Sequence, residues 1–143
     1  MPLQHVNFHT WRNRPVFAQP EFDGMMRRCL PDVLGSRGVL CLAWEIMPTH
    51  VHLVVADFPD FSLPAIMKHV KGDTSRAFFA CFPDLRADLG DGHLWRKGYY
   101  AAAISSHRQY LATVSYVKSN LAAAGLAPPT SLTAADDRDS AAW

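Results

Sequence analysis

Two histidines separated by one residue are the side chains in this sequence best suited to chemistry. His50 and His52 lie in MPTHVHLVV, a run whose valine and leucine content is typical of a buried β-strand. Successive side chains on a strand point to opposite faces, so both imidazoles project from one face of a sheet. A neutral imidazole is a common metal ligand, and a strand holds two of them rigidly. The pattern indicates a metal site, although two ordinary packing histidines would give the same pattern.

A second candidate group lies near the end of the chain, on a segment with helical periodicity. At about 100° per residue, one apolar stripe falls on a single helix face and is expected to be buried. The members of this stripe are Tyr110, Val114, Val117 and Leu121. Tyr116 lies about 130° from the middle of the stripe, and Asn120 follows one turn later on the same side. We therefore predict that Tyr110 belongs to the core and that Tyr116 and Asn120 form a polar pair outside it.

A phenol beside two metal-binding imidazoles has a specific chemical use. The tyrosine oxygen can attack a phosphodiester if a cation withdraws charge from the phosphate oxygens and a base or solvent takes the proton. Two imidazoles and the Asn120 amide oxygen, with water and phosphate completing an octahedron, suit Mg²⁺ or Mn²⁺ better than a closed zinc site. The spacing of these groups therefore predicts metal-assisted phosphoryl transfer.

The elements that must position these groups alternate between strands and helices. Strands are expected at residues 6–11, 39–47, 50–58 and 94–104, and helices at residues 20–35, 62–81 and 105–124. Pro31 should kink or end the first helix, and Gly72 should interrupt the second. The short connection at Pro48 and Thr49 implies antiparallel pairing, so the His-x-His strand should lie inside the sheet. This order predicts an α+β ferredoxin-like sandwich, with helices on one face of an antiparallel sheet and the other face free for a ligand.

Length and composition are those of a single-domain, water-soluble protein. The 143 residues include 49% hydrophobic and 19% charged side chains, enough to bury a core, and no stretch is long enough to span a membrane. The first residues lack the apolar segment of a signal peptide, so a cytoplasmic location is expected. Cys29, Cys41 and Cys81 fall at apolar positions and indicate reduced core thiols. Residues 127–143 are small and polar, so we expect a folded domain over residues 1–126 and a flexible tail.

Charge leaves a nucleic-acid partner open. The net charge is only +1, but three aspartates of the expected tail lower it, and the domain itself is more basic. Arg12 and Arg14 lie on one side of an extended segment, where they could grip phosphate or form a solvated strand edge. The cations of the second expected helix, Lys68, Lys71 and Arg76, have the usual pattern of a solvated face.

Four stretches together resemble one family, the single-tyrosine HUH nucleases, which include the small insertion-sequence (IS200-like) transposases and the REP-associated tyrosine transposases. HUH denotes His, hydrophobic residue, His, and is matched by His50, Val51 and His52. WRNRPVF resembles the family's basic segment after the first strand, and HLWRKGYY resembles its Leu-Trp-x-x-Gly-Tyr-Tyr strand. YVKSNLAAAGL resembles its Tyr-Ile-x-x-Asn-Pro-x-x-Ala-Gly-Leu helix end. The resemblance covers the chain up to about Leu126, with the motifs in the family's order.

The resemblance implies a role for each matching residue. Tyr116 matches the nucleophile that forms a 5′-phosphotyrosine link to single-stranded DNA and frees a 3′-hydroxyl. His50 and His52 match the metal ligands, and Asn120 matches the third, which implies a divalent Mg²⁺ or Mn²⁺ cofactor. Leu121 stands where the REP-associated pattern has proline, which leaves the placement of Asn120 open.

The resemblance also implies a partner, single-stranded DNA that carries hairpins. The expected contacts are backbone phosphates for the basic residues and base stacking for the tryptophan, namely Arg12, Arg14, Lys68, Lys71, Arg76, Arg96 and Trp95. Both a homodimer and a monomer are compatible with the sequence. Two alternatives are a binding module of the same fold that has lost catalysis and a replication or conjugation nickase of the broader HUH group. The short chain and the match to the transposases disfavour the nickase.

Overall fold

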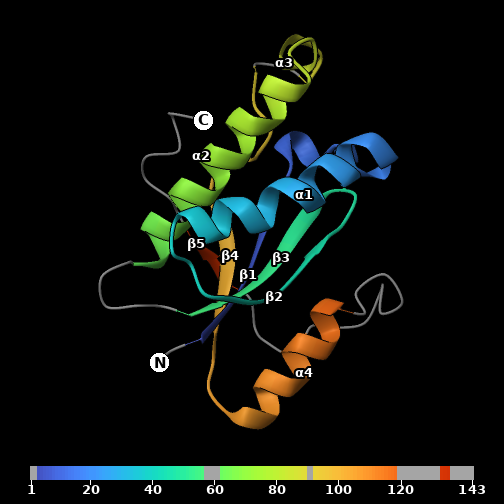
Figure 1. The fold of residues 1–143 in the computed structure, drawn as a ribbon. Coiled ribbons are helices and arrows are strands. Elements are labelled where there is room, and N and C mark those ends of the chain that lie inside the picture. The colour runs from blue at the N-terminus through green and yellow to red at the C-terminus, as the bar shows by residue number, and fades with distance from the viewer. Residues whose placement is uncertain (1–2, 57–61, 90–91, 119–132, 136–143) are drawn as a thin grey trace.

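The structure describes residues 3–56, 62–89, 92–118 and 133–135. Within these ranges, the computed structural model has an antiparallel sheet covered by α-helices (Figure 1). The strands, in the order in which they lie side by side, are β2 (Cys41–Ile46), β3 (His50–Ala56), β1 (Leu3–His9), β4 (Tyr99–Ile104) and β5 (Thr133–Ala135). The helices are α1 (Pro20–Ser36), α2 (Leu63–Cys81), the short α3 (Leu85–Asp88) and α4 (His107–Lys118). The predicted α+β sandwich is confirmed.

The sheet separates two layers of helices (Figure 1). α1 and α2 pack on one face, over a core to which β3 contributes Val51 and Leu53. α4 lies on the other face, where Val117 packs with Ala43 and Val54. Because neighbouring side chains of β3 alternate between the faces, its histidines share the face of α4. The face expected to be free for a ligand is therefore partly covered by the last helix.

β3 lies inside the sheet, as the short turn before it predicted. It pairs antiparallel with β2 on one side and with β1 on the other, and its residues from Val51 to Ala56 are buried. The register sets His9 opposite His50 and Asn7 opposite His52. A slip of one residue would turn both imidazoles of β3 to the other face, so burial of the intervening aliphatic side chains fixes the site.

The first helix continues through Pro31, so the prediction of a kink or an end there is wrong. α1 runs on to Ser36. Proline lacks the N–H that would bond to the Arg27 carbonyl, but Pro31 lies on the exposed side, where solvent can reach that carbonyl. The helix is held to the core by its buried side chains, Met25, Met26, Leu30 and Leu34.

The second helix also runs without the interruption expected at Gly72. Ser62 caps it, because its Oγ accepts the Ala65 N–H at 3.4 Å. Gly72 is buried within the helix, and a Cβ at this position would lie 3.3 Å from Nη1 of Arg76. The Arg76 side chain is exposed and can shift by a few tenths of an ångström, so the structure gives no steric reason for a glycine here, and the helix runs through it without a break.

Three residues of the segment expected to be a flexible tail form the short strand β5. β5 pairs antiparallel with β4, so that Tyr99 lies opposite Ala135. The end of the last helix and the domain boundary expected at residue 126 lie outside the described residues. β4 begins at Tyr99 and not at Leu94, and the preceding segment forms an isolated bridge between Thr10 and Trp95.

Composition gave two further expectations that the structure addresses. Cys29 and Cys41 are partly buried, as expected of core thiols, but Cys81 is exposed at the end of α2. No helix in the described ranges has the length and apolar character needed to cross a membrane.

Candidate active site

Four imidazoles gather on the sheet face that α4 covers. β1 contributes His5 and His9, and β3 contributes His50 and His52. Residues two apart on a strand share a face, and the antiparallel register brings the two pairs side by side. The rings of His9 and His50 stack with their centroids 4.9 Å apart, and those of His5 and His52 stack at 5.2 Å. We call these four side chains the histidine cluster.

The two histidines of the His-x-His motif each point one nitrogen at the other. Their Nε2 atoms are 3.1 Å apart. Each Nδ1 atom has another partner: His50 Nδ1 lies 3.1 Å from Thr49 Oγ1, and His52 Nδ1 lies 3.0 Å from His5 Nε2. Hydrogen bonds at Nδ1 orient an imidazole and leave its Nε2 available to a ligand. Both rings are therefore arranged to present Nε2 at one point.

This pair of nitrogens fits a divalent cation. Two nitrogens in neighbouring positions around one ion, each about 2.1 Å from it, lie about 3 Å apart. The observed Nε2–Nε2 distance of 3.1 Å agrees. Among the residues that the structure describes, no three His, Cys, Asp or Glu side chains are arranged to hold a metal ion. The remaining ligands would therefore be water, substrate oxygen or an amide.

Two amides come into question for that position. Asn120, which the resemblance implies as a ligand, lies outside the described residues. Asn7 lies on the same face of β1, between His5 and His9, and its Oδ1 is buried without a hydrogen-bond partner. A buried carbonyl oxygen without a donor is costly unless water or an ion meets it. Asn7 therefore adds an oxygen atom to the possible metal ligands of this face, which the His-x-His motif alone does not indicate.

Burial keeps the histidine cluster neutral at pH 7. It lowers the pKa of His5 and of His50 to about 4, and the pKa of His52 to about 3, because removal from water disfavours the charged imidazolium. Neighbouring imidazoles lower the pKa of His50 and of His52 further. The pKa of His9 is lowered by burial first and then by the Arg96 guanidinium. Neutral imidazole is the form that binds metals.

Tyr116 reaches the histidine cluster from α4 of the same chain. Its ring meets that of His52 edge-on at a centroid distance of 5.8 Å and that of His5 at 6.1 Å. α4 lies here because Thr113 and Val117 are buried on its sheet side. The structure thus brings together the phenol and the imidazole pair that the sequence singled out.

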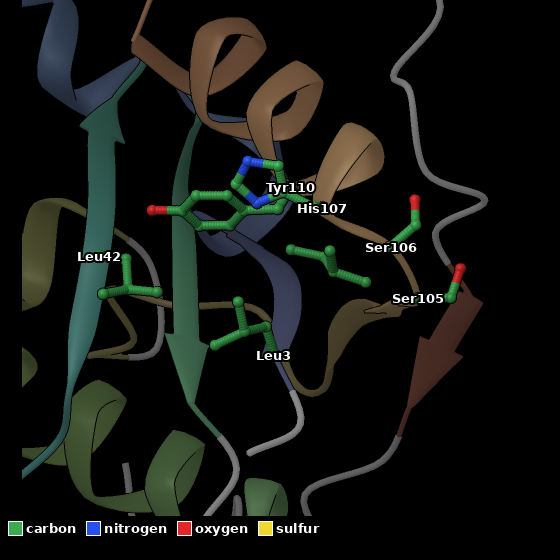
Figure 2. A pocket seen from close by; sticks show the side chains of 7 residues that line it. Leu3, Leu42, Ser105, Ser106, His107 and Tyr110 are labelled. Carbon is green, nitrogen blue, oxygen red and sulfur yellow. The ribbon is translucent and has the colours of Figure 1, made fainter.

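The burial of the two tyrosines predicted from helical phase differs from their burial in the structure. Tyr110 was expected in the core and Tyr116 outside it, but both are half-buried against the sheet. The buried side of α4 falls between them, so each tyrosine flanks it. Tyr110 faces a separate hollow at the start of α4, where Figure 2 shows its ring beside His107, with Leu3 and Leu42 also lining the pocket.

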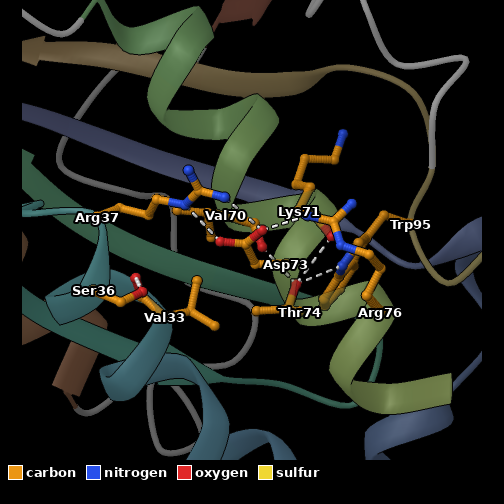
Figure 3. A network of polar contacts seen from close by, with 9 residues as sticks. All are labelled: Val33, Ser36, Arg37, Val70, Lys71, Asp73, Thr74, Arg76 and Trp95. Atoms are coloured by element: carbon orange, nitrogen blue, oxygen red, sulfur yellow. Dashed lines mark hydrogen bonds and ion pairs between the residues drawn. The ribbon is translucent and has the colours of Figure 1, made fainter. Parts of the chain in front are cut away.

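Two residues expected to contact DNA are buried, so the structure contradicts that role. Lys71 has no exposed surface, and its Nζ donates to the carbonyls of Arg96 at 2.8 Å and Gly98 at 2.6 Å. Trp95 is 1% exposed, and its indole N–H donates to Thr74 Oγ1 at 3.0 Å (Figure 3). Neither side chain can reach a phosphate or stack on a base. Both instead fasten α2 to the segment before β4.

The other cations of α2 lie across the sheet from Tyr116. Arg76 is exposed and pairs with Asp73, which also binds Arg37 with Nε 2.7 Å from Oδ2 (Figure 3). Lys68 is half-buried one helical turn before residue 71. DNA that touched these cations and Tyr116 at once would have to pass around the edge of the sheet.

Arg96 is a basic residue that lies close to the histidine cluster. Its Nη2 donates to the Tyr100 hydroxyl at 2.9 Å, and the Tyr100 ring meets His9 edge-on at 5.6 Å. Its charge already acts on the cluster, because it lowers the pKa of His9. A phosphate bound at the cluster would lie close to this guanidinium.

The segment after β1 carries Arg12 and Arg14, the remaining two arginines that were expected to contact DNA, and part of its backbone has an unusual conformation. Arg12 and Asn13 have positive φ angles of 56° and 53°, a conformation that costs energy for residues with a side chain. Arg12 is exposed, with its guanidinium 5.7 Å from the centre of the Trp11 ring. Arg14 is half-buried, and its Nη1 donates to the Asp88 carbonyl at 3.0 Å. The segment begins at the end of β1, next to His9.

Sequence reasoning missed His5, Asn7 and His9. They occupy alternate positions of β1, the same spacing that singled out His50 and His52, so a signal was present. Alternation shows that they share a face of their own strand. Only the pairing of β1 with β3 shows that this face is the one carrying the His-x-His motif.

The geometry can be compared with known proteins. Residues 3–120 match the model of a family described as “Transposase IS200 like”. The chain belongs to the IS200-like transposase family. This membership confirms the resemblance seen in the sequence motifs.

Two IS200-like relatives match over part of their length. The ISDra2 transposase TnpA of Deinococcus radiodurans is 32% identical over 85 residues, which cover 59% of this chain and 60% of that protein. The transposase for insertion sequence element IS200 of Salmonella typhimurium is 25% identical over 97 residues, 65% of this chain and 64% of that protein. The matches therefore span less than two thirds of either relative.

Solved structures share the fold of this IS200-like chain. A crystal structure from Deinococcus radiodurans R1, described as a transposase, has a TM-score of 0.65 at 28% identity and covers 78% of this chain and 85% of its own. A REP-associated tyrosine transposase bound to a REP hairpin has a TM-score of 0.63 and covers 88% of this chain and 70% of its own. Its identity is 16%, so the second likeness concerns the fold alone.

Proposed function

We propose that this protein is a metal-dependent transposase that cleaves and rejoins single-stranded DNA at hairpin-bearing ends through a covalent 5′-phosphotyrosine. The main support is the position of the Tyr116 ring, whose centroid is 5.8 Å from that of His52 in the same chain. Family membership supports transposition as the biological context. The hairpin substrate is suggested by the REP-associated structural relative, which is bound to a REP hairpin.

In the proposed reaction, Tyr116 acts as the nucleophile. Its Oη forms a bond to phosphorus, the bond from phosphorus to the 3′-oxygen breaks, and that oxygen leaves as a hydroxyl after taking up a proton. The phenol proton goes to a base or solvent. The new ester conserves the energy of the broken bond, so a 3′-hydroxyl from another DNA end can reverse the attack and join the two strands. No nucleotide cofactor is needed for either step.

His50 and His52 would hold the divalent cation in this proposal, through the Nε2 atoms that lie 3.1 Å apart. Asn120 is the proposed third ligand. Mg²⁺ or Mn²⁺ bound there supplies charge stabilisation of the phosphate oxygens. The pKa values of both imidazoles are lowered by burial, so neither ligand must lose a proton at pH 7.

DNA contacts are proposed for the cations that lie close to the histidine cluster, near the end of β1. Arg96 lies beside Tyr100 and His9, and Arg12 and Arg14 follow directly after β1. One guanidinium group can donate two parallel hydrogen bonds to the oxygens of a phosphate, which suits it to contacts with a DNA backbone. Lys68 and Arg76 are proposed only as more distant contacts, because α2 lies on the opposite face.

The test is formation of a covalent adduct. Protein incubated with hairpin-bearing single-stranded DNA and Mn²⁺ should give a species that survives denaturing electrophoresis, and Tyr116→Phe should abolish it. Tyr110→Phe is the matched control, because it removes the other half-buried hydroxyl of α4 and should leave the adduct in place.

An adduct that persists in Tyr116→Phe would reject this nucleophile. Hairpin DNA binding without any adduct, in Mg²⁺ and in Mn²⁺, would instead identify a binding module of the same fold without catalysis.

A further inference from the structure

We propose that His5 is a positioning residue that accepts the Nδ1–H of His52 and thereby keeps the Nε2 lone pair of His52 available to the cation. This inference rests on the proposed metal-binding role of His52. The contact is direct, because His5 Nε2 lies 3.0 Å from His52 Nδ1. Both side chains are buried, with 0% and 2% of their surfaces exposed. Water therefore does not compete for this hydrogen bond, and its direction matters.

The direction of the bond decides whether His52 can be a ligand. A neutral imidazole carries one proton, on Nδ1 or on Nε2. If His52 Nδ1 donates to His5, its Nε2 carries a lone pair. If His5 donates instead, the proton of His52 lies on Nε2 and blocks coordination. An acceptor at residue 5 therefore selects the tautomer that binds a metal.

The other ligand has an equivalent support. His50 Nδ1 lies 3.1 Å from Thr49 Oγ1, a hydroxyl that can accept an N–H. With both Nδ1 atoms donating, two lone pairs face each other at 3.1 Å. This arrangement is repulsive by itself and is relieved by a cation. The pair of supports therefore favours the geometry of the metal-bound site.

His5 also contacts the proposed nucleophile. Its ring meets the Tyr116 ring at a centroid distance of 6.1 Å and an interplanar angle of 70°. It thus contacts both the ligand His52 and the phenol, from a strand that is paired on both sides. The same imidazole orients His52 by a hydrogen bond and limits the position of Tyr116 by contact.

The experiment compares two substitutions of His5 by their Mn²⁺ affinity in the intact protein without DNA. His5→Phe keeps an aromatic ring against Tyr116 and removes the acceptor, and we expect its affinity to fall about 10- to 100-fold. His5→Gln retains an oxygen near the position of Nε2 and should recover most of the affinity. His69→Phe, on α2 across the sheet, is the remote control and should match the wild type. Free Mn²⁺ is measured by electron paramagnetic resonance, and circular dichroism checks folding.

A second readout tests the tautomer itself. In long-range ¹⁵N–¹H spectra of the metal-free wild-type protein, His52 should carry its proton on Nδ1, and in metal-free His5→Phe this preference should be lost. A proton on Nε2 of His52 in the wild type, or equal Mn²⁺ affinity in folded His5→Phe and wild type, would overturn the proposal. Affinity loss of the same size in His5→Gln would also overturn it, because the acceptor would then not be the cause. Failure of the Tyr116 adduct would leave these measurements unaffected, since they use no DNA.

Discussion

At the scale of single residues, burial gives the imidazoles a definite protonation state. An exposed histidine titrates near neutral pH, but His5, His50 and His52 have pKa values lowered to about 4, 4 and 3. The protein must therefore fold around neutral rings, and the same neutrality suits them to a cation. A site with exposed histidines would lose part of its metal affinity to protons at mildly acidic pH.

This state predicts how the stability of the metal-free protein depends on pH. In the unfolded chain these imidazoles take up protons as the pH falls below about 6.5, whereas the folded chain resists until about pH 4 or below. The free energy of unfolding should be highest above pH 6.5 and fall as the pH falls toward 4. Urea denaturation at pH 7, 6 and 5 measures this slope.

His52→Asn provides the comparison, because it removes one buried titrating group. Its slope should be shallower than that of the wild type by up to about 1.4 kcal/mol per pH unit, the contribution of one whole proton, and this difference should grow as the pH falls from 7 to 5. Equal slopes in the two proteins would contradict the assignment of His52 as a buried neutral imidazole.

At the scale of elements, α4 is the part of the fold that brings Tyr116, the proposed nucleophile, to the sheet. Its first turn is held by a side-chain cap: Ser106 Oγ accepts the Gln109 N–H at 3.1 Å, and Gln109 Oε1 accepts the Ser105 N–H at 2.7 Å. This is a variant of the serine and glutamine capping box. Within the described helix, Thr113 and Val117 are the buried side chains, and the cap adds to the stability that their packing gives.

Removing the cap should loosen the helix. Ser106→Ala is expected to lower the free energy of unfolding by about 1 kcal/mol, because the Gln109 N–H loses its acceptor. Hydrogen exchange should rise along α4 more than along α1. Ser115→Ala, at an exposed position within the same helix, should change stability by less than about 0.5 kcal/mol. Equal effects of the two substitutions would argue against a capping role.

At the scale of the whole molecule, the two faces of the sheet carry different kinds of side chain. One face carries mainly side chains that stabilise the fold, and the other carries those of the proposed site. The face toward α1 and α2 holds the large core, together with Lys71 and Trp95, whose polar atoms are used up within the fold. The face toward α4 holds the histidine cluster and Tyr116. Because both halves of the proposed site come from one chain, a single copy contains the proposed nucleophile and the imidazole pair.

This arrangement predicts that the site assembles within one chain. Tyr116→Phe and His52→Asn should each abolish adduct formation, and a mixture of the two variants should remain inactive, because neither copy holds both groups. The assay is the same denaturing electrophoresis with hairpin DNA and Mn²⁺. Adduct recovered in the mixture would show that copies exchange α4 and build the site between them.

Features that depend on local periodicity could be predicted from the sequence alone. Alternation along a strand put His50 and His52 on one face, and the short turn before them put their strand inside the sheet. Both conclusions follow from backbone geometry over a few residues.

Contacts between residues far apart in the sequence, and the burial of individual side chains, could be read only from the folded structure. A lysine and a tryptophan in a basic, aromatic stretch look the same whether they face DNA or the core, and burial of Lys71 and Trp95 follows from the packing of α2 against the segment before β4. The role of His5 depends on the register between β1 and β3, which no local pattern states. Tyr116 meets His52 because α4 packs across the sheet, and that contact is a property of the assembled chain.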